Sequence, residues 1–136
     1  MNTKEKGDRA IGQAISHYIS QNYEVCLPIG DKRSYDLVVE KGGSLKRVQV
    51  KFAGYYPNKD QCLVGLRITG GNQSYHYAKK YEKDDFDELF IYTERGAKYQ
   101  IPWECVKARS EISIENKKYD EYKISQDTKV VNWGRL

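Results

Sequence analysis

Two short segments of alternating polar and apolar residues flank the pair Gly42-Gly43, and this pattern constrains the fold more than any other feature of the chain. Residues 34–40 and 45–52 follow the two-residue period of a β-strand along most of their length. A glycine pair suits the positive φ angles that a two-residue hairpin loop requires. The sequence therefore predicts an antiparallel hairpin with one apolar face and one polar face.

The polar face of this hairpin is expected to gather three side chains of different chemistry. If Lys41 pairs with Ser44, counting back along both arms puts Asp36 opposite Gln49, and cross-strand Cβ atoms lie about 4.5 to 5.5 Å apart. Lys51 lies two residues beyond Gln49 and shares its face. A solvated strand face also collects polar residues, but Asp is disfavoured inside so apolar a strand. We therefore interpret the acid, amide and ammonium groups as the outline of a metal-dependent nuclease site.

The length and cysteine content indicate an intracellular protein of one domain. The chain has 136 residues, enough for a core without disulfides or a structural metal, and we expect a single domain over residues 1–136. Its three cysteines are odd in number and far apart, so reduced thiols are the simplest interpretation. No apolar run could span a bilayer, and the N-terminus lacks the apolar core of a secretion signal. We expect a cytoplasmic protein with no membrane segment.

The charge and the aromatic content permit nucleic-acid binding without requiring it. The net charge is +4, from 23 basic and 19 acidic residues, which is a modest positive excess. Several of the twelve tyrosines lie beside basic residues, as in residues 75–81, where they could stack on bases or sugars. Tyrosine is equally common in ordinary strands, and we favour that structural explanation for most of them.

The rest of the sequence predicts one N-terminal helix and several short strands. An apolar stripe at helical spacing runs through residues 3–21, and Asn2 or Thr3 could cap this helix. Strands are expected at residues 23–29, 62–69, 89–93 and 98–101, a loop at 70–74, a helical turn at 103–107, and strand or loop segments at 111–115 and 119–125. This order describes an α+β protein with a mixed or antiparallel sheet.

Three short phrases and the element order resemble the PD-(D/E)XK nuclease superfamily. The phrases are Lys-Gly-Asp-Arg-Ala at residues 6–10, Tyr-Asp-Leu-Val-Val at 35–39 and Val-Gln-Val-Lys at 48–51. Within the superfamily they are most similar to the restriction-fold homing endonucleases of bacterial group I introns, in which Gln replaces the second acid. The resemblance implies an α/β (α+β) fold, a restriction-endonuclease-like αβββαβ core with a mixed central sheet. It covers about residues 1–105 and leaves a C-terminal extension over about 106–136.

The resemblance also implies roles for the residues of the hairpin. Asp36, the side-chain oxygen of Gln49 and the backbone carbonyl of Val50 would bind a divalent metal, and Lys51 would orient or activate the attacking water. The ion would be Mg²⁺ or Mn²⁺, with Ca²⁺ as a substitute that does not support cleavage. Phosphodiester hydrolysis needs a cation to neutralise the transition state, and Mg²⁺ prefers oxygen ligands.

Ile11 departs from the pattern that the resemblance implies. Related nucleases place a Glu at this point of the first helix, and that Glu reaches the metal. Ile11 is expected near the middle of the apolar stripe, and from the sequence alone it is an ordinary core residue. With one carboxylate left, the site should bind Mg²⁺ weakly. Either the protein is naturally impaired or the substitution was introduced to trap uncleaved DNA, and we favour the second explanation.

The resemblance leaves several functions open. We favour a sequence-specific homing endonuclease that cuts double-stranded DNA, because of the Gln-Val-Lys phrase. A Holliday junction resolvase or a restriction-like nuclease of the same fold is the alternative, and a noncatalytic DNA-binding domain is the alternative from another class. A double-strand cut needs two active sites, so the resemblance implies a homo-oligomer, either a dimer or a tetramer.

Contacts with DNA are expected from basic, amide and aromatic side chains before the hairpin and around the predicted loop at 70–74. Arginine and amide groups can read base edges, whereas lysines mostly bind phosphates. Each of these residues is also an ordinary solvated residue on most protein surfaces. The expected contacts are Lys32, Arg33, Arg67, Asn72, Gln73, Tyr75, Lys79 and Lys80.

Overall fold

The computed structural model describes residues 1–71, 76–108 and 110–125, and the side chains of residues 67–79 are outside that description. The elements in chain order are α1 (Thr3–Ser20), β1 (Glu24–Cys26), β2 (Leu37–Lys41), β3 (Ser44–Tyr56), β4 (Gln61–Gly65), β5 (Arg67–Gly71), β6 (His76–Lys80), β7 (Glu88–Thr93), β8 (Lys98–Pro102), the 3-10 helix η1 (Trp103–Cys105), β9 (Glu111–Ile114) and the 3-10 helix η2 (Lys117–Tyr122).

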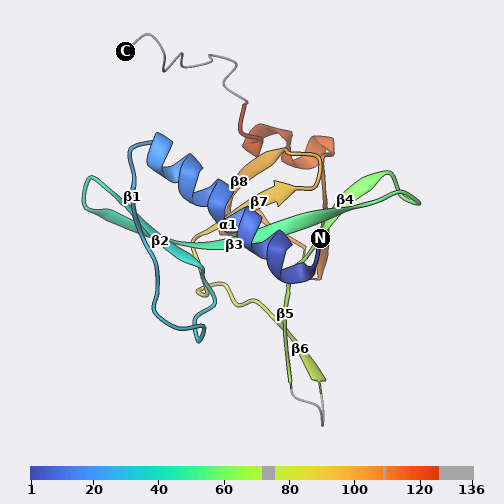
Figure 1. Ribbon diagram of the computed structural model, residues 1–136, viewed down its shortest axis with the longest axis horizontal. Coiled ribbons are helices and arrows are strands. Elements are labelled where there is room, and N and C mark those ends of the chain that lie inside the picture. The colour runs from blue at the N-terminus through green and yellow to red at the C-terminus, as the bar shows by residue number, and fades with distance from the viewer. Residues whose placement is uncertain (72–75, 109, 126–136) are drawn as a thin grey trace.

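Strand β3 is the centre of a seven-stranded mixed sheet (Figure 1). Its first residues pair antiparallel with β2, its middle pairs parallel with β7, and its last residues pair antiparallel with β4. Strands β1 and β9 extend the sheet beyond β2 and β4, and β8 pairs with β7. The parallel pairing of β3 with β7 confirms the mixed central sheet, because every other pairing described in this sheet is antiparallel.

Helix α1 begins where the sequence predicts. The side chain of Asn2 accepts a hydrogen bond from the Glu5 N–H at 2.9 Å, which satisfies one of the free amide groups of the first turn. The helix ends at Ser20, and Asn22 then adopts a left-handed conformation with φ of 67°. Asn2 is therefore the N-cap residue, as one of the two predicted choices.

The buried stripe of α1 differs from the predicted one in its centre. Ala10, Ala14 and Tyr18 are fully buried, whereas Ile11 is only half-buried and Ile19 is 57% exposed. Two alanines on the buried face let the helix approach the sheet closely. Ile11 consequently lies at the flank of the stripe, and the prediction that placed it near the middle was wrong.

A chain of buried and partly buried hydrogen bonds fixes α1 against β7 and β8. The Tyr18 hydroxyl donates to Glu88 at 2.6 Å, and the Gln100 side-chain N–H donates to the same carboxylate at 3.0 Å. The His17 Nε2 lies 2.7 Å from the Gln100 side-chain oxygen. Buried polar groups are costly unless they are paired, so this chain restricts how the helix can sit on the sheet.

Two hydrophobic clusters cover opposite sides of the sheet. The α1-side cluster contains Ala10, Ala14, Tyr18, Leu37, Val39, Val48, Val50 and Phe90. The second cluster includes Phe86, Leu89, Ile91 and Trp103. Residues after Cys105 contribute Ile112, Ile114 and Tyr119 to this second cluster, and β9 pairs with β4. The described part of the C-terminal segment thus belongs to the folded core.

The main difference from the expected αβββαβ order lies between β4 and β7. No second α-helix occurs there among the residues that the structure describes. The chain instead forms a separate two-stranded antiparallel ribbon from β5 and β6, which projects from the body (Figure 1). Residues 67–71 include Ile, Thr and two glycines, and glycine disfavours a helix.

Most of the remaining sequence predictions hold with shifted boundaries, whereas those at 62–69 and 119–125 differ in the kind or number of elements. The strand predicted at 23–29 is shorter, because Pro28 has no N–H to donate to a neighbouring strand. The strand predicted at 62–69 is interrupted at Leu66, whose N–H donates to the Ser110 carbonyl at 2.8 Å. The predicted segments at 103–107 and 111–115 contain η1 and β9, whereas 119–125 begins inside η2. The predicted loop at 70–74 starts within β5, and its last three residues lie outside the described part of the chain.

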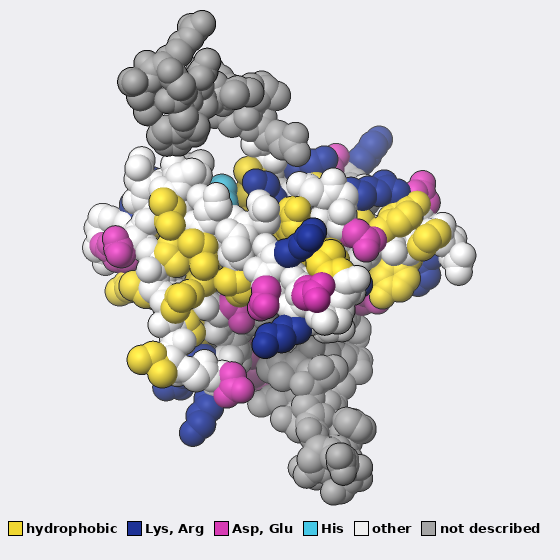
Figure 2. All heavy atoms as spheres, viewed as in Figure 1, with side chains coloured by type: hydrophobic (Ala, Val, Ile, Leu, Met, Phe, Trp, Pro, Cys, Tyr) yellow, Lys and Arg dark blue, Asp and Glu magenta, His cyan; other side chains and the backbone are white. Residues whose placement is uncertain are grey.

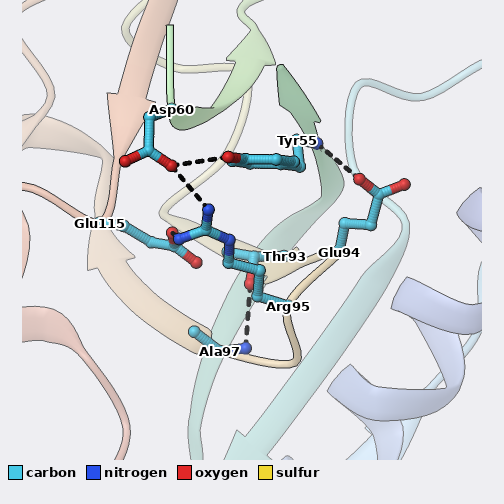
Figure 3. Close-up of polar contacts among 7 residues, drawn as sticks. All are labelled: Tyr55, Asp60, Thr93, Glu94, Arg95, Ala97 and Glu115. Carbon is cyan, nitrogen blue, oxygen red and sulfur yellow. Dashed lines mark hydrogen bonds and ion pairs between the residues drawn. The ribbon is translucent and has the colours of Figure 1, made fainter. Parts of the chain in front are cut away.

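An exposed polar cluster ties the β3–β4 turn to the β7–β8 turn (Figure 3). The Arg95 guanidinium lies 2.9 Å from Asp60, 3.6 Å from Glu115 and 4.0 Å from the centre of the Tyr55 ring. The Tyr55 hydroxyl donates to Asp60 at 2.6 Å. Hydrogen bonds from Tyr55 and Arg95 lower the pKa of Asp60. We call these four residues the Arg95 cluster.

The described helices include none that is both long enough and apolar enough to cross a membrane.

Candidate active site

The hairpin register that the sequence predicts is confirmed. Lys41 pairs with Ser44, and Gly42 and Gly43 have φ angles of 59° and 84°, as a two-residue loop requires. Leu37 pairs with Val48. The printed pairing ends at Leu37 and Val48, and Asp36 precedes β2, so the predicted position of Asp36 across from Gln49 stays a prediction.

Asp36 lies directly before β2. Its side chain takes the place of a neighbouring strand by accepting a hydrogen bond from the backbone of β3. Its backbone N–H donates to the Val48 carbonyl at 2.8 Å. Its carboxylate accepts a hydrogen bond from the Val50 N–H, also at 2.8 Å. Burial raises the pKa of the Asp36 carboxyl, although the Val50 N–H and the charge of Lys51 oppose this shift. Asp36 is therefore a partly desolvated carboxylate at an open edge of β3.

Lys51 is the positive charge of the site. Burial lowers the pKa of Lys51, and the attraction of Asp36 opposes this shift. Both groups are thus held in surroundings that disfavour their charged forms, while each favours the charge of the other. An arrangement of this kind is typical of groups that take part in proton transfer or metal binding.

Gln49 and Val50 are the other two predicted sources of oxygen ligands. The Gln49 side chain is 9% exposed, and its amide nitrogen lies 3.3 Å from the Val50 carbonyl oxygen. The amide oxygen of Gln49, the Val50 carbonyl and the Asp36 carboxylate are all hard oxygen donors, which fit Mg²⁺ or Mn²⁺ by their chemistry. Only one of them is charged, so the set fits a weakly bound ion.

Ile11 supplies no further donor. It is half-buried and packs against the α1-side cluster, which contains Val50. Across the described residues, no group of three or more His, Cys, Asp or Glu side chains is arranged to hold a metal ion. In this protein, Asp36 is the one carboxylate of the proposed oxygen set.

The expected DNA contacts fall in two regions, and several lie outside the described side chains. Lys32 and Arg33 are exposed in the loop that leads to Asp36, and Lys80 is exposed at the end of β6. Arg67 and Lys79 belong to β5 and β6, but their side chains are outside the description. Asn72, Gln73 and Tyr75 lie outside the described residues altogether.

Tyr81 adjoins the site, and sequence reasoning did not single it out. The Lys51 ammonium lies 5.1 Å from the centre of the Tyr81 ring. Burial, together with the charges of Asp36 and Asp85, raises the pKa of Tyr81 to about 12. The signal available in the sequence was its position at the end of the basic and aromatic segment 75–81. That segment gives no indication that Tyr81 meets Lys51, because the contact is long-range.

Comparison with known proteins assigns a class to this arrangement. Residues 1–133 match the PD-(D/E)XK endonuclease family, and the chain belongs to that family. Among solved structures it is similar to a bacterial homing endonuclease, I-Ssp6803I, with 29% sequence identity and a TM-score of 0.76. The similarity covers 96% of this chain and 84% of that one. No curated protein sequence matches the chain. The family and the restriction-endonuclease-like fold that the sequence resemblance implied are confirmed.

Proposed function

We propose that the protein is a metal-dependent endonuclease that recognises and cuts a specific double-stranded DNA sequence, as a homing endonuclease does. The observation that supports this most is that Asp36 and Lys51 influence each other's charge at one open edge of β3, where the Val50 N–H donates to the Asp36 carboxylate. The family and the similar homing endonuclease support the same reaction.

The residues of the site have separate roles in this proposal. Asp36, the Gln49 amide oxygen and the Val50 carbonyl would hold a divalent ion, which supplies a Lewis acid for the charge that develops on the scissile phosphate. Lys51 orients the attacking water and stabilises negative charge beside Asp36. Its partial burial favours this role, because desolvation strengthens electrostatic interactions.

Ile11 leads us to propose that this form of the protein is impaired. Metal affinity at oxygen sites rises with the number of anionic ligands, and the family resemblance implies an anionic ligand at the position that Ile11 occupies in this chain. The expected result is DNA binding with slow or absent cleavage. A substitution introduced to trap the complex with DNA would have the same effect.

The β5–β6 ribbon supports the proposed recognition of a DNA sequence. A two-stranded ribbon fits the major groove of a duplex, and β5–β6 projects from the body with Lys80 exposed (Figure 1). The face that carries α1 shows acidic, basic and apolar side chains intermixed, without a continuous basic surface among its described residues (Figure 2). We therefore assign DNA recognition to the ribbon and to the loop with Lys32 and Arg33. We further propose a dimer or tetramer in the cytoplasm, since two strands require two sites.

Restoring the second acid tests this proposal. We expect Ile11→Glu to nick supercoiled plasmid DNA in Mg²⁺ or Mn²⁺ but not in Ca²⁺, and Ile11→Gln, of similar size but uncharged, to remain near the parent. Adding Asp36→Asn to Ile11→Glu should remove the gain. Cleavage of a randomised duplex library by Ile11→Glu would then identify the target. If Ile11→Glu gains no activity in either metal, the proposed reaction is wrong.

The single carboxylate favours one other function, a DNA-binding domain that has lost its chemistry. In that case duplex binding would persist, Ile11→Glu would gain nothing, and Asp36→Asn would change neither metal nor DNA affinity. Equilibrium binding of labelled duplex to the parent and to Asp36→Asn, with and without Mn²⁺, separates the two functions.

A further inference from the structure

We propose that Tyr81 is a positioning residue for the nuclease site, because its aromatic ring holds the Lys51 ammonium in place beside Asp36. This inference rests on the proposed function for its consequence in catalysis. The contact itself is a feature of the fold, with the Lys51 Nζ 5.1 Å from the ring centre. A cation within about 6 Å of an aromatic ring centre is attracted by the negative charge of the ring face.

The Tyr81 ring is itself held on two sides. Its plane is nearly perpendicular to that of Phe86, with ring centres 5.1 Å apart, and to that of Trp103, with centres 6.0 Å apart. Phe86 is 1% exposed and Trp103 is 8% exposed, so both partners belong to the rigid core. The Trp103 indole N–H also donates to the Glu82 carbonyl at 3.1 Å, which anchors the residue after Tyr81.

An aromatic ring is chemically suited to hold a lysine in a nuclease site. A carboxylate partner would neutralise the ammonium and occupy its N–H donors. A ring face attracts the cation without accepting its protons as a carboxylate does, so the three donors of Lys51 stay available for water and phosphate. Asp36 also acts on both groups, since its charge favours the ammonium of Lys51 and adds to the effect of burial, which raises the pKa of Tyr81.

Tyr81 also links Lys51 to a surface cleft. The cleft has a volume of about 710 Å³ and is lined by Tyr81, Lys83, Trp103 and Lys107, among others.

NMR of the side chain of Lys51 tests the inference without requiring cleavage. In protein labelled with ¹³C-lysine, the signal that disappears in Lys51→Arg identifies the Hε protons of Lys51. These protons should show an upfield ring-current shift and restricted motion. We expect Tyr81→Phe to keep both features, and Tyr81→Leu to lose both. Lys118, which lies 5.5 Å from the Tyr119 ring, is the control and should not change in either variant. Tyr81→Met provides the same comparison if Tyr81→Leu does not fold.

Cleavage in the Ile11→Glu background gives the second readout. Tyr81→Leu should slow single-turnover nicking by roughly fivefold to thirtyfold with unchanged DNA affinity, whereas Tyr81→Phe should stay near the parent. Unchanged Lys51 signals in Tyr81→Leu would overturn the inference, as would equal losses in Tyr81→Phe and Tyr81→Leu. If the signals change as expected and Ile11→Glu cuts no DNA, the positioning contact stands and only the proposed function fails.

Discussion

Two groups in this protein each contain an aspartate, a cation and a tyrosine, but their electrostatics are opposite. In the Arg95 cluster, Asp60 and Arg95 are exposed, and direct hydrogen bonds lower the pKa of Asp60 and raise that of Arg95. At the open edge of β3, burial raises the pKa of Asp36 and lowers that of Lys51. Hydrogen bonding thus favours the charged forms in the first group, whereas burial disfavours them in the second.

The difference shows what burial does to a charged pair. Exposed ions keep their water and add a hydrogen bond, so charge is retained at little cost. Partly buried ions lose water and depend on one another and on any ion or substrate that binds. Only the second arrangement gains by binding a cation and a phosphate, and for this reason we assign the chemistry to Asp36 and Lys51 rather than to the more conspicuous cluster in Figure 3.

The largest expected contrast is in cleavage by the Ile11→Glu protein. Lys51→Met should reduce the nicking rate by at least about 100-fold, because it removes the group that orients water and stabilises charge. Arg95→Met should leave the rate close to that of Ile11→Glu. Plasmid nicking under single-turnover conditions measures both. Similar losses of nicking rate in the two variants would contradict the assignment of the chemistry to Lys51 rather than to the Arg95 cluster.

Stability should respond in opposite directions to the same change at the two aspartates. Asp36→Asn removes a desolvated charge and should raise the free energy of unfolding at pH 7 by about 1 kcal/mol in the absence of metal. Asp60→Asn removes a charge that Arg95 and Tyr55 stabilise, so it should lower that free energy. Urea unfolding in EDTA measures both, and a destabilised Asp36→Asn would contradict the account.

The pH dependence of these two effects should also differ. The folded pKa of Asp36 lies above the ordinary value of 3.8, so the advantage of Asp36→Asn over the parent should begin to shrink before acidification reaches that value, and vanish below it. The folded pKa of Asp60 lies below 3.8, so the defect of Asp60→Asn should persist down to that pH and shrink only beneath it. Thermal unfolding at a series of pH values compares the windows. Coincident windows would show that the two aspartates have similar surroundings.

The smallest effect is expected from Tyr55→Phe. The variant loses the hydroxyl that donates to Asp60 and keeps the ring that lies 4.0 Å from the Arg95 guanidinium. The ion pair of Arg95 with Asp60 remains, so the loss of stability should be smaller than that of Asp60→Asn. Urea unfolding of the two variants side by side decides this. A larger loss of stability in Tyr55→Phe than in Asp60→Asn would show that the Tyr55 hydroxyl contributes more to stability than the ion pair does.

The sequence was sufficient for the parts of the site that are local. A glycine pair and a two-residue period determine the register of a hairpin, so the pairing from Lys41 with Ser44 to Leu37 with Val48 followed from counting residues. The same holds for Asn2, whose capping role depends on residues within one turn. Local chemistry leaves few alternatives in both cases.

The parts that depend on long-range packing could not be predicted. The meeting of Tyr81 with Lys51 requires the path of the chain through β4, β5 and β6, which periodicity does not give. The half-buried position of Ile11 depends on the buried alanines and on the hydrogen bond of Tyr18 with β7. These contacts determine which residues of α1 face the sheet. The ribbon in place of the second helix was not predicted either, because the second helix was expected from the family resemblance despite the glycines of β5.

The most direct test of the central claim is Mn²⁺ titration of the parent protein followed by amide NMR. A paramagnetic ion broadens the resonances of nearby residues, and we predict selective broadening of Asp36, Gln49, Val50 and Lys51 that Asp36→Asn abolishes. The amides around Asp60 and Glu115 should stay sharp, because Arg95 already pairs with both carboxylates. Broadening around Asp60 first, or equal broadening of the parent and Asp36→Asn, would contradict the assignment of the metal to the edge of β3.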